Sequence, residues 1–146
     1  MSKPPLTRRQ RRATVAVFSA ALAMTVVGAV PAYAGWTTLV PVGNSVLLAC
    51  KTPEEGGYGP VWKITLVLAT SQSDQVGGAR VAVRRNGQRV SRTRLRTSAP
   101  GQWDVKTTYA SRLFRDRLRG VAGFGDGQGH GAGDSFRIAA RRLASC

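Results

Sequence analysis

An arginine-rich stretch from Ala79 to Arg96 is the part of this chain best equipped to bind another molecule. An arginine guanidinium forms paired hydrogen bonds with a phosphate or a carboxylate, and several on one ribbon create a field that attracts polyanions. The stretch therefore predicts an anion-binding surface, with Arg84, Arg85, Arg89, Arg92 and Arg94 as its contacts. It holds seven arginines and neither a lysine nor an acid, at Arg80, Arg84, Arg85, Arg89, Arg92, Arg94 and Arg96.

A second interpretation of these arginines needs no ligand. Charged side chains on an edge strand prevent two sheets from pairing edge to edge, so the arginines could serve solubility alone. If they do bind, the candidate partners are teichoic or teichuronic acids, anionic lipid headgroups, extracellular DNA and acidic polysaccharides. The stretch contains no aromatic residue on which a nucleic-acid base could stack. Four more arginines follow nearby, at Arg112, Arg115, Arg117 and Arg119.

A hydrolytic site would add an acid and a base to such arginines. Glu54, Glu55 and His130 belong to the residue classes that small secreted ribonucleases use, which makes a phosphodiesterase the alternative function. We expect no catalytic residues, however, because His130 lies in a glycine-rich segment that would hold it poorly. The sequence has no nucleophile elbow, no zinc-ligand spacing and no phosphate loop followed by lysine and a helix. It therefore predicts no metal and no cofactor.

The glycine-rich segment is the second unusual feature of the sequence. Seven glycines occur between Gly120 and Gly133. Backbone amides of such a segment could face an anion, but a flexible connection between strands is the simpler interpretation. We expect a loop over Gly123 to Asp134.

The beginning of the chain has the pattern of a secretory signal peptide. Basic residues from Lys3 to Arg12 precede an almost wholly apolar run from Ala13 to Val30, and Ala32-Tyr33-Ala34 forms a small-x-small site. We expect cleavage after Ala34 and secretion; a membrane anchor is the alternative, since the run has 18 residues. Five basic residues and no acid leave with residues 1–34, so the formal charge falls from +15 to +10.

Residues 35–146 are enough for a single secreted domain with its own core. The chain has two cysteines, Cys50 and Cys146. In an oxidising compartment they are expected to form a disulfide that closes nearly the whole domain; two thiols that stay reduced or pair between molecules are the alternative. The excess of arginine over lysine and the many alanines and glycines are typical of a high-GC bacterium.

The elements that would position the arginines are short strands. Asn86-Gly87 predicts the tight turn of a β-hairpin, with Val81 and Val83 on its inner side and a bulge or an edge position in its second arm. Further strands are expected over Gly35 to Val42, Ser45 to Cys50, Val61 to Thr70, Trp103 to Tyr109, the second part of Leu113 to Phe124, and Ser135 to Leu143. Trp103, Val105 and Tyr109 are expected to face the core, and Thr52 to Pro60 to form a surface loop.

Six to eight short strands without a long amphipathic helix predict an all-β domain, an antiparallel β-sandwich of Ig-like architecture, with a small β-barrel as the alternative. In size and architecture the chain resembles the apoproteins of enediyne antibiotics and the subtilisin inhibitors of actinomycetes, although those carry two disulfides. That resemblance implies a protein-binding, inhibitor-like module with Thr52 to Pro60 as its exposed segment. The preferred interpretation is a monomeric, non-catalytic module that binds an anionic polymer of the cell envelope.

Overall fold

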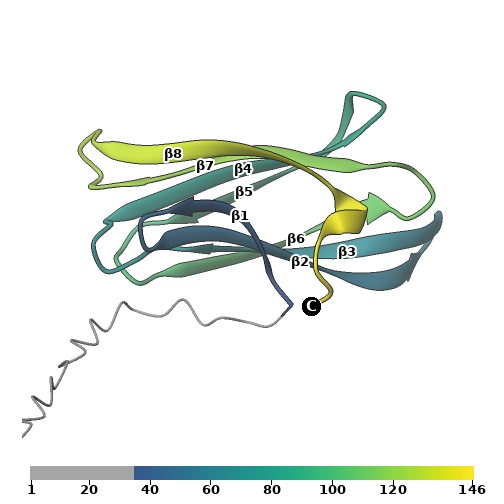
Figure 1. The fold of residues 1–146 in the computed structure, drawn as a ribbon, viewed down its shortest axis with the longest axis horizontal. Helices are drawn as coiled ribbons and strands as arrows, with labels where there is room; N and C mark the ends of the chain where they lie inside the picture. Colours follow the sequence, from purple (N-terminus) through teal and green to yellow (C-terminus); the bar gives the residue numbers. More distant parts are fainter. Residues whose placement is uncertain (1–34) are drawn as a thin grey trace, which may run out of the picture.

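The computed structural model describes residues 35–146, and the expected signal peptide lies outside the described residues. This part of the chain forms eight strands and one short 3-10 helix (Figure 1). No helix within residues 35–146 is long and apolar enough to span a membrane. In chain order the elements are β1 (Thr37–Val42), β2 (Ser45–Gly56), β3 (Gly59–Ala69), β4 (Val76–Arg85), β5 (Gln88–Thr97), β6 (Trp103–Ser111), β7 (Arg117–Gly125), β8 (Gly131–Ala139) and η1 (Ala140–Arg142).

The strands form two antiparallel four-stranded sheets that pack face to face, with the orders β1-β2-β3-β6 and β5-β4-β7-β8 (Figure 1). The predicted all-β sandwich is therefore confirmed, and the sheets do not merge into one closed barrel. The order β5-β4-β7-β8 corresponds to the C′-C-F-G sheet of an immunoglobulin variable domain. The other sheet differs from the immunoglobulin order, because β3 follows β2 directly as its hairpin partner.

The core lies between the two sheets. Leu47, Ile64, Leu66 and Leu68 fill it from one side; Val81, Val83, Leu95 and Leu118 fill it from the other. Each is almost completely removed from solvent, which stabilises the folded state by roughly 1.5–3 kcal/mol per side chain. Because side chains alternate along a strand, the residues just before and after each of these inward positions point to the outer face of the sheet.

A disulfide joins Cys50 on β2 to Cys146, as predicted, with a Cα–Cα distance of 4.9 Å and 96 residues of sequence separation. The last residues also bond to β2 through the backbone. The amide of Lys51 donates to the carbonyl of Ala144 at 2.9 Å, and the amide of Cys146 donates to the carbonyl of Lys51 at 3.0 Å. The C-terminal segment therefore takes up the part of the β2 edge that the short strand β1 leaves open.

The loop predicted over Thr52 to Pro60 is wrong, because this segment is a β-hairpin. The strands β2 and β3 continue to Gly56 and Gly59, and only Gly57 and Tyr58 form the turn. Both prolines are tolerated for a positional reason. Pro53 lies beyond the end of β1 on an edge, and Pro60 precedes Val61, where the pairing with β6 begins, so neither position needs a second ladder hydrogen bond.

The predicted inner face of β6 is also wrong. Trp103, Val105 and Tyr109 are 44%, 53% and 51% exposed, whereas Thr108 and Ala110 are buried. The reason is the polar edge at which β6 meets β5. The hydroxyls of Ser91 and Thr108 lie 3.0 Å apart, and the Asp104 carboxylate accepts the amide of Arg96 at 2.8 Å. These bonds hold the polar set of β6 toward β5 and leave the aromatic set outside.

Most of the predicted loop over Gly123 to Asp134 belongs to strands. β7 and β8 form a hairpin in which Gly125 opposes Gly131 and Gly123 opposes Gly133, leaving only residues 126–130 for the turn. Close backbone approach explains part of this composition. A Cβ at Gly125 would lie 2.3 Å from the His130 carbonyl oxygen, and one at Gly131 would lie 2.5 Å from that of Phe124.

Candidate anion-binding face

The arginine-rich stretch forms the predicted hairpin of β4 and β5. Asn86 and Gly87 have φ values of 49° and 81°, the left-handed conformation that a two-residue turn of this kind requires. The guanidinium of Arg84 donates to the Gly87 carbonyl at 2.7 Å. The predicted bulge is present as a register shift between Val83 and Arg84, and β5 is an edge strand, as expected.

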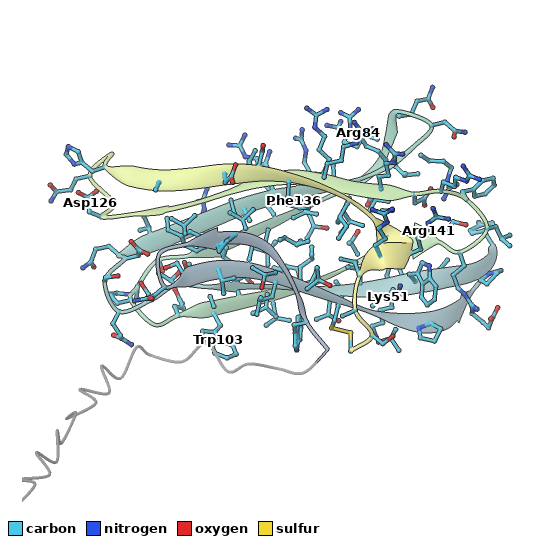
Figure 2. All side chains as sticks on the ribbon, in the orientation of Figure 1. Lys51, Arg84, Trp103, Asp126, Phe136 and Arg141 are labelled. Atoms are coloured by element: carbon cyan, nitrogen blue, oxygen red, sulfur yellow. A yellow bond between two sulfur atoms is a disulfide. The ribbon has the colours of Figure 1, made fainter. Side chains whose placement is uncertain are left out.

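Most of the hairpin arginines point to the outer face of their sheet. Ala79, Val81, Val83 and Leu95 are buried in the core, so the alternate positions of β4 and β5 face outward. Figure 2 shows the side chain of Arg84 directed away from the sandwich. The outward arginines of the hairpin are Arg80, Arg84, Arg89, Arg92, Arg94 and Arg96.

The neighbouring strands continue this surface. Arg117 on β7 is the direct partner of Arg84, Arg119 lies opposite Ala82, and Arg137 on β8 is the partner of Arg119. None of the outward positions of these four described strands holds an acid. We call this surface the arginine face; its nine arginines are Arg80, Arg84, Arg89, Arg92, Arg94, Arg96, Arg117, Arg119 and Arg137.

Protection of a sheet edge applies to the arginines of β5 and β8 but not to those of the central strands. β5 is an edge strand, but β4 and β7 are the two central strands of the sheet and carry Arg80, Arg84, Arg117 and Arg119. Like charges on directly opposed positions, such as Arg84 and Arg117, destabilise a sheet. A concentration of unpaired charge on central strands therefore opposes folding, whereas it favours binding of an anion.

Arg85 is placed differently from the other four predicted contacts. Its Nε and Nη2 donate to the two carboxylate oxygens of Asp116 at 2.9 and 3.0 Å, and its guanidinium lies 4.3 Å from the Phe114 ring centre. The hydrogen bond to Asp116 raises the pKa of Arg85. Arg84, Arg89, Arg92 and Arg94 thus lie together on the arginine face, while Arg85 holds the end of the sandwich together.

Asp116 receives a third hydrogen bond, from the amide of Ser111 at 2.8 Å, and is only 2% exposed. We expect Asp116→Asn to lower the free energy of unfolding by about 2–3 kcal/mol, because the new amide would direct N–H donors toward donors in a buried site. Urea unfolding measures this change. Asp134→Asn removes the same charge from an exposed position on β8 and should change stability little. Equal effects of the two substitutions would contradict a structural role for the Arg85–Asp116 pair.

Two depressions that share lining residues lie on the arginine face. One, of about 520 Å³, is lined by Gly78, Arg80, Arg94, Arg96 and Val121, with Ala79 and Leu95. The other, of about 700 Å³, also includes Gly78 and Arg96 and extends over the glycines of β7 and β8 to His130. We call the first the arginine hollow and the second the glycine trough. Together they let a ligand reach the backbone of the sheet beside several guanidinium groups.

The residues of the alternative phosphodiesterase site do not come together. His130 lies in the β7–β8 turn, whereas Glu54 and Glu55 lie near the tip of the β2–β3 hairpin at the other end of the sandwich (Figure 1). His130 Nδ1 is instead 3.1 Å from the carboxylate of Asp126. Hydrogen bonds from the amides of Gln128 and His130 lower the pKa of Asp126 and shape the turn. Within residues 35–146, no group of three or more His, Cys, Asp or Glu is placed to hold a metal ion.

Sequence reasoning missed the contribution of β8 to the arginine face. The alternation that places Phe136 and Ile138 inward also places Arg137 outward, so the signal was present in the sequence. Alternation along one strand does not show which strands lie next to it in the sheet. Only the register of β7 with β4 and β8 shows that Arg119 and Arg137 lie beside the hairpin.

The opposite side of the molecule has a different character. On the outer face of β1-β2-β3-β6, Val46, Leu48, Val67 and Ala69 form a second apolar cluster with Trp36 packed against it. Trp103 and Val105 lie beside this cluster through the pairing of β6 with β3. The two faces of the sandwich are therefore chemically distinct, since one is cationic and the other holds an apolar cluster. No protein-family model matches this chain, and no curated protein or solved structure matches it at a significant level.

Proposed function

We propose that the protein is a secreted, non-catalytic module that binds an anionic extracellular or cell-envelope polymer through its arginine face. The observation that carries this proposal is the presence of nine arginines and no acid at the outward positions of a four-stranded sheet, with four of these arginines on its central strands. A broad cationic surface of this kind suits an extended polymer better than a small ligand, because many weak contacts add along the chain. The disulfide supports secretion, since such bonds persist in oxidising compartments.

The proposal is tested by binding of the purified, disulfide-bonded protein to anionic polymers over a salt series. We expect retention on cell-wall material that carries anionic polymers and loss of retention when those polymers are removed. Retention should fall steeply with salt, since each guanidinium–phosphate contact releases a counterion. Absence of retention at physiological salt on every polyanion tested would reject the proposed function and leave the arginines as a solvated surface.

A further inference from the structure

The arginine hollow places three cationic residues around exposed backbone. Arg80 on β4 and Arg94 on β5 are direct cross-strand partners, and Arg96 is the partner of Gly78. These residues and Val121 line the hollow. Since Gly78 has no side chain, the floor between the guanidinium-bearing residues is open to an incoming group. An anion there can meet several fork-shaped donors at once, the arrangement in which arginine binds phosphate most strongly.

The backbone does not require a glycine at the floor of the hollow. Gly78 has no positive φ, and a Cβ built on it would meet nothing within 4 Å. It differs in this respect from Gly133, where a Cβ would lie 2.7 Å from the Ala122 carbonyl oxygen. A glycine inside a strand weakens the strand and often marks a position that a ligand approaches closely. The glycine at the floor and the arginines around it therefore both favour binding of an anion in the hollow.

We propose that the arginine hollow is a phosphate subsite for a linear polymer in which phosphodiesters join neutral polyol or sugar units. This inference rests on the proposed function and names its substrate class. Arg92, Arg94 and Arg96 occupy alternate positions of β5, about 6.8 Å apart along the strand. They present evenly spaced cations to a chain with one phosphate per short repeat. The glycine trough, which shares Gly78 and Arg96 with the hollow, receives the neutral unit that follows.

The side chains of the arginine face favour this class of polymer over single-stranded nucleic acid. Proteins that bind single strands stack bases on exposed aromatic rings between cationic residues. Among the outward positions of β4, β5, β7 and β8, no Phe, Tyr or Trp occurs, and the exposed large apolar residues are Val90 and Val121. The exposed rings of Trp103 and Tyr109 lie on β6, in the other sheet. A polymer without bases needs no aromatic rings for stacking, so their absence from this surface does not weaken its binding.

The hollow can be filled without changing any charge. We expect Gly78→Val to weaken binding to a glycerol-phosphate polymer of defined length about tenfold, the effect of losing one charge-assisted phosphate contact. The salt dependence should persist, because every arginine remains. Gly57→Val is the matched control: a Cβ there also meets nothing within 4 Å, but Gly57 lies in the β2–β3 turn and its replacement should leave binding unchanged. Gly78→Ser, a smaller change, should give an intermediate loss.

The wild type and the variants are titrated with the glycerol-phosphate polymer and with an oligothymidylate that has the same number of phosphates. Thermal unfolding of each variant shows whether it is folded. The oligothymidylate should bind more weakly and respond little to Gly78→Val. If the folded Gly78→Val and Gly78→Ser variants bind the glycerol-phosphate polymer as tightly as the wild type, the subsite is rejected while the proposed function stands. If the oligothymidylate binds more tightly and Gly78→Val weakens that binding, the ligand class is nucleic acid instead. If the wild type binds neither probe nor any other polyanion at physiological salt, the proposed function fails with the subsite.

Discussion

Replacing both cysteines by alanine is expected to lower the free energy of unfolding by about 4–5 kcal/mol, the value that loop-closure entropy gives for a bridge across nearly 100 residues. The Cys50–Cys146 bond spans 96 residues, so it restricts almost the whole described chain when unfolded. A loss of this size is a large part of the stability of a small domain. Denaturant unfolding of the wild type and of Cys50→Ala/Cys146→Ala measures it.

Reductant provides the control for this prediction. It should destabilise the wild type toward the stability of the double variant and leave the double variant unchanged. The backbone bonds between Lys51, Ala144 and Cys146 could keep the C-terminal segment in place without the disulfide. A loss below about 1 kcal/mol in the double variant would show that those bonds suffice and that the disulfide adds little beyond them.

Neutralising the centre of the arginine face is expected to have the largest effect on binding. Arg92 and Arg119 flank Ala82 on the two neighbouring strands, and Arg94 is the next outward residue of β5. We expect the triple substitution of Arg92, Arg94 and Arg119 by glutamine to lower affinity for a phosphate polymer about 100-fold at physiological salt. The plot of log affinity against log salt has a negative slope, and the magnitude of this slope should decrease by about 2–3 because three counterion-releasing contacts are lost. Binding titrations over a salt series measure both quantities.

The matched control removes three arginines from elsewhere. Arg115, Arg141 and Arg142 are exposed but lie outside the four strands that build the arginine face. Their triple substitution by glutamine gives the same net charge and should reduce affinity only severalfold through the weaker overall field. Thermal stability should not fall in the first triple variant, because like charges on neighbouring strands are removed. Equal losses of affinity in the two variants would mean that the total charge, and not the arginine face, governs binding.

The parts of the fold that local chemistry determines could be predicted from the sequence. Asn86-Gly87 tolerates the positive φ of a two-residue turn, which located the hairpin, and the alternation of Ile64, Leu66 and Leu68 located a core strand. The disulfide followed from two cysteines in a chain expected to be secreted. Each of these inferences uses residues that are close in the sequence, or a pair with no competing partner.

The parts that depend on distant neighbours could not be predicted. Alternation divides the side chains of β6 into two sets but does not say which set faces inward. Hydrophobicity predicts that Trp103 and Tyr109 face the core. In the structure Thr108 and Asp104 lie on the inner side instead, because they form hydrogen bonds with β5. Likewise, glycine signals both flexible loops and closely approaching strands, and only pairing of Gly125 with Gly131 distinguishes them. The arginine face itself required the register of four strands, because its residues come from two separate hairpins.

The position of the two ends of the described chain has a consequence for how the protein can be displayed. Gly35 lies against the carbonyl of Ser145, and Ser145 forms a β-bridge with Lys51 of β2, in the sheet opposite the arginine face. The C-terminus lies beside this sheet in Figure 1. A tether joined to Gly35 would therefore leave from the rear of the binding surface. Copies fixed to a support in this way would all turn their guanidinium groups outward, and a single long polyanion could bridge neighbouring copies. Such an array would hold the polymer by avidity at salt concentrations that release it from one copy in solution.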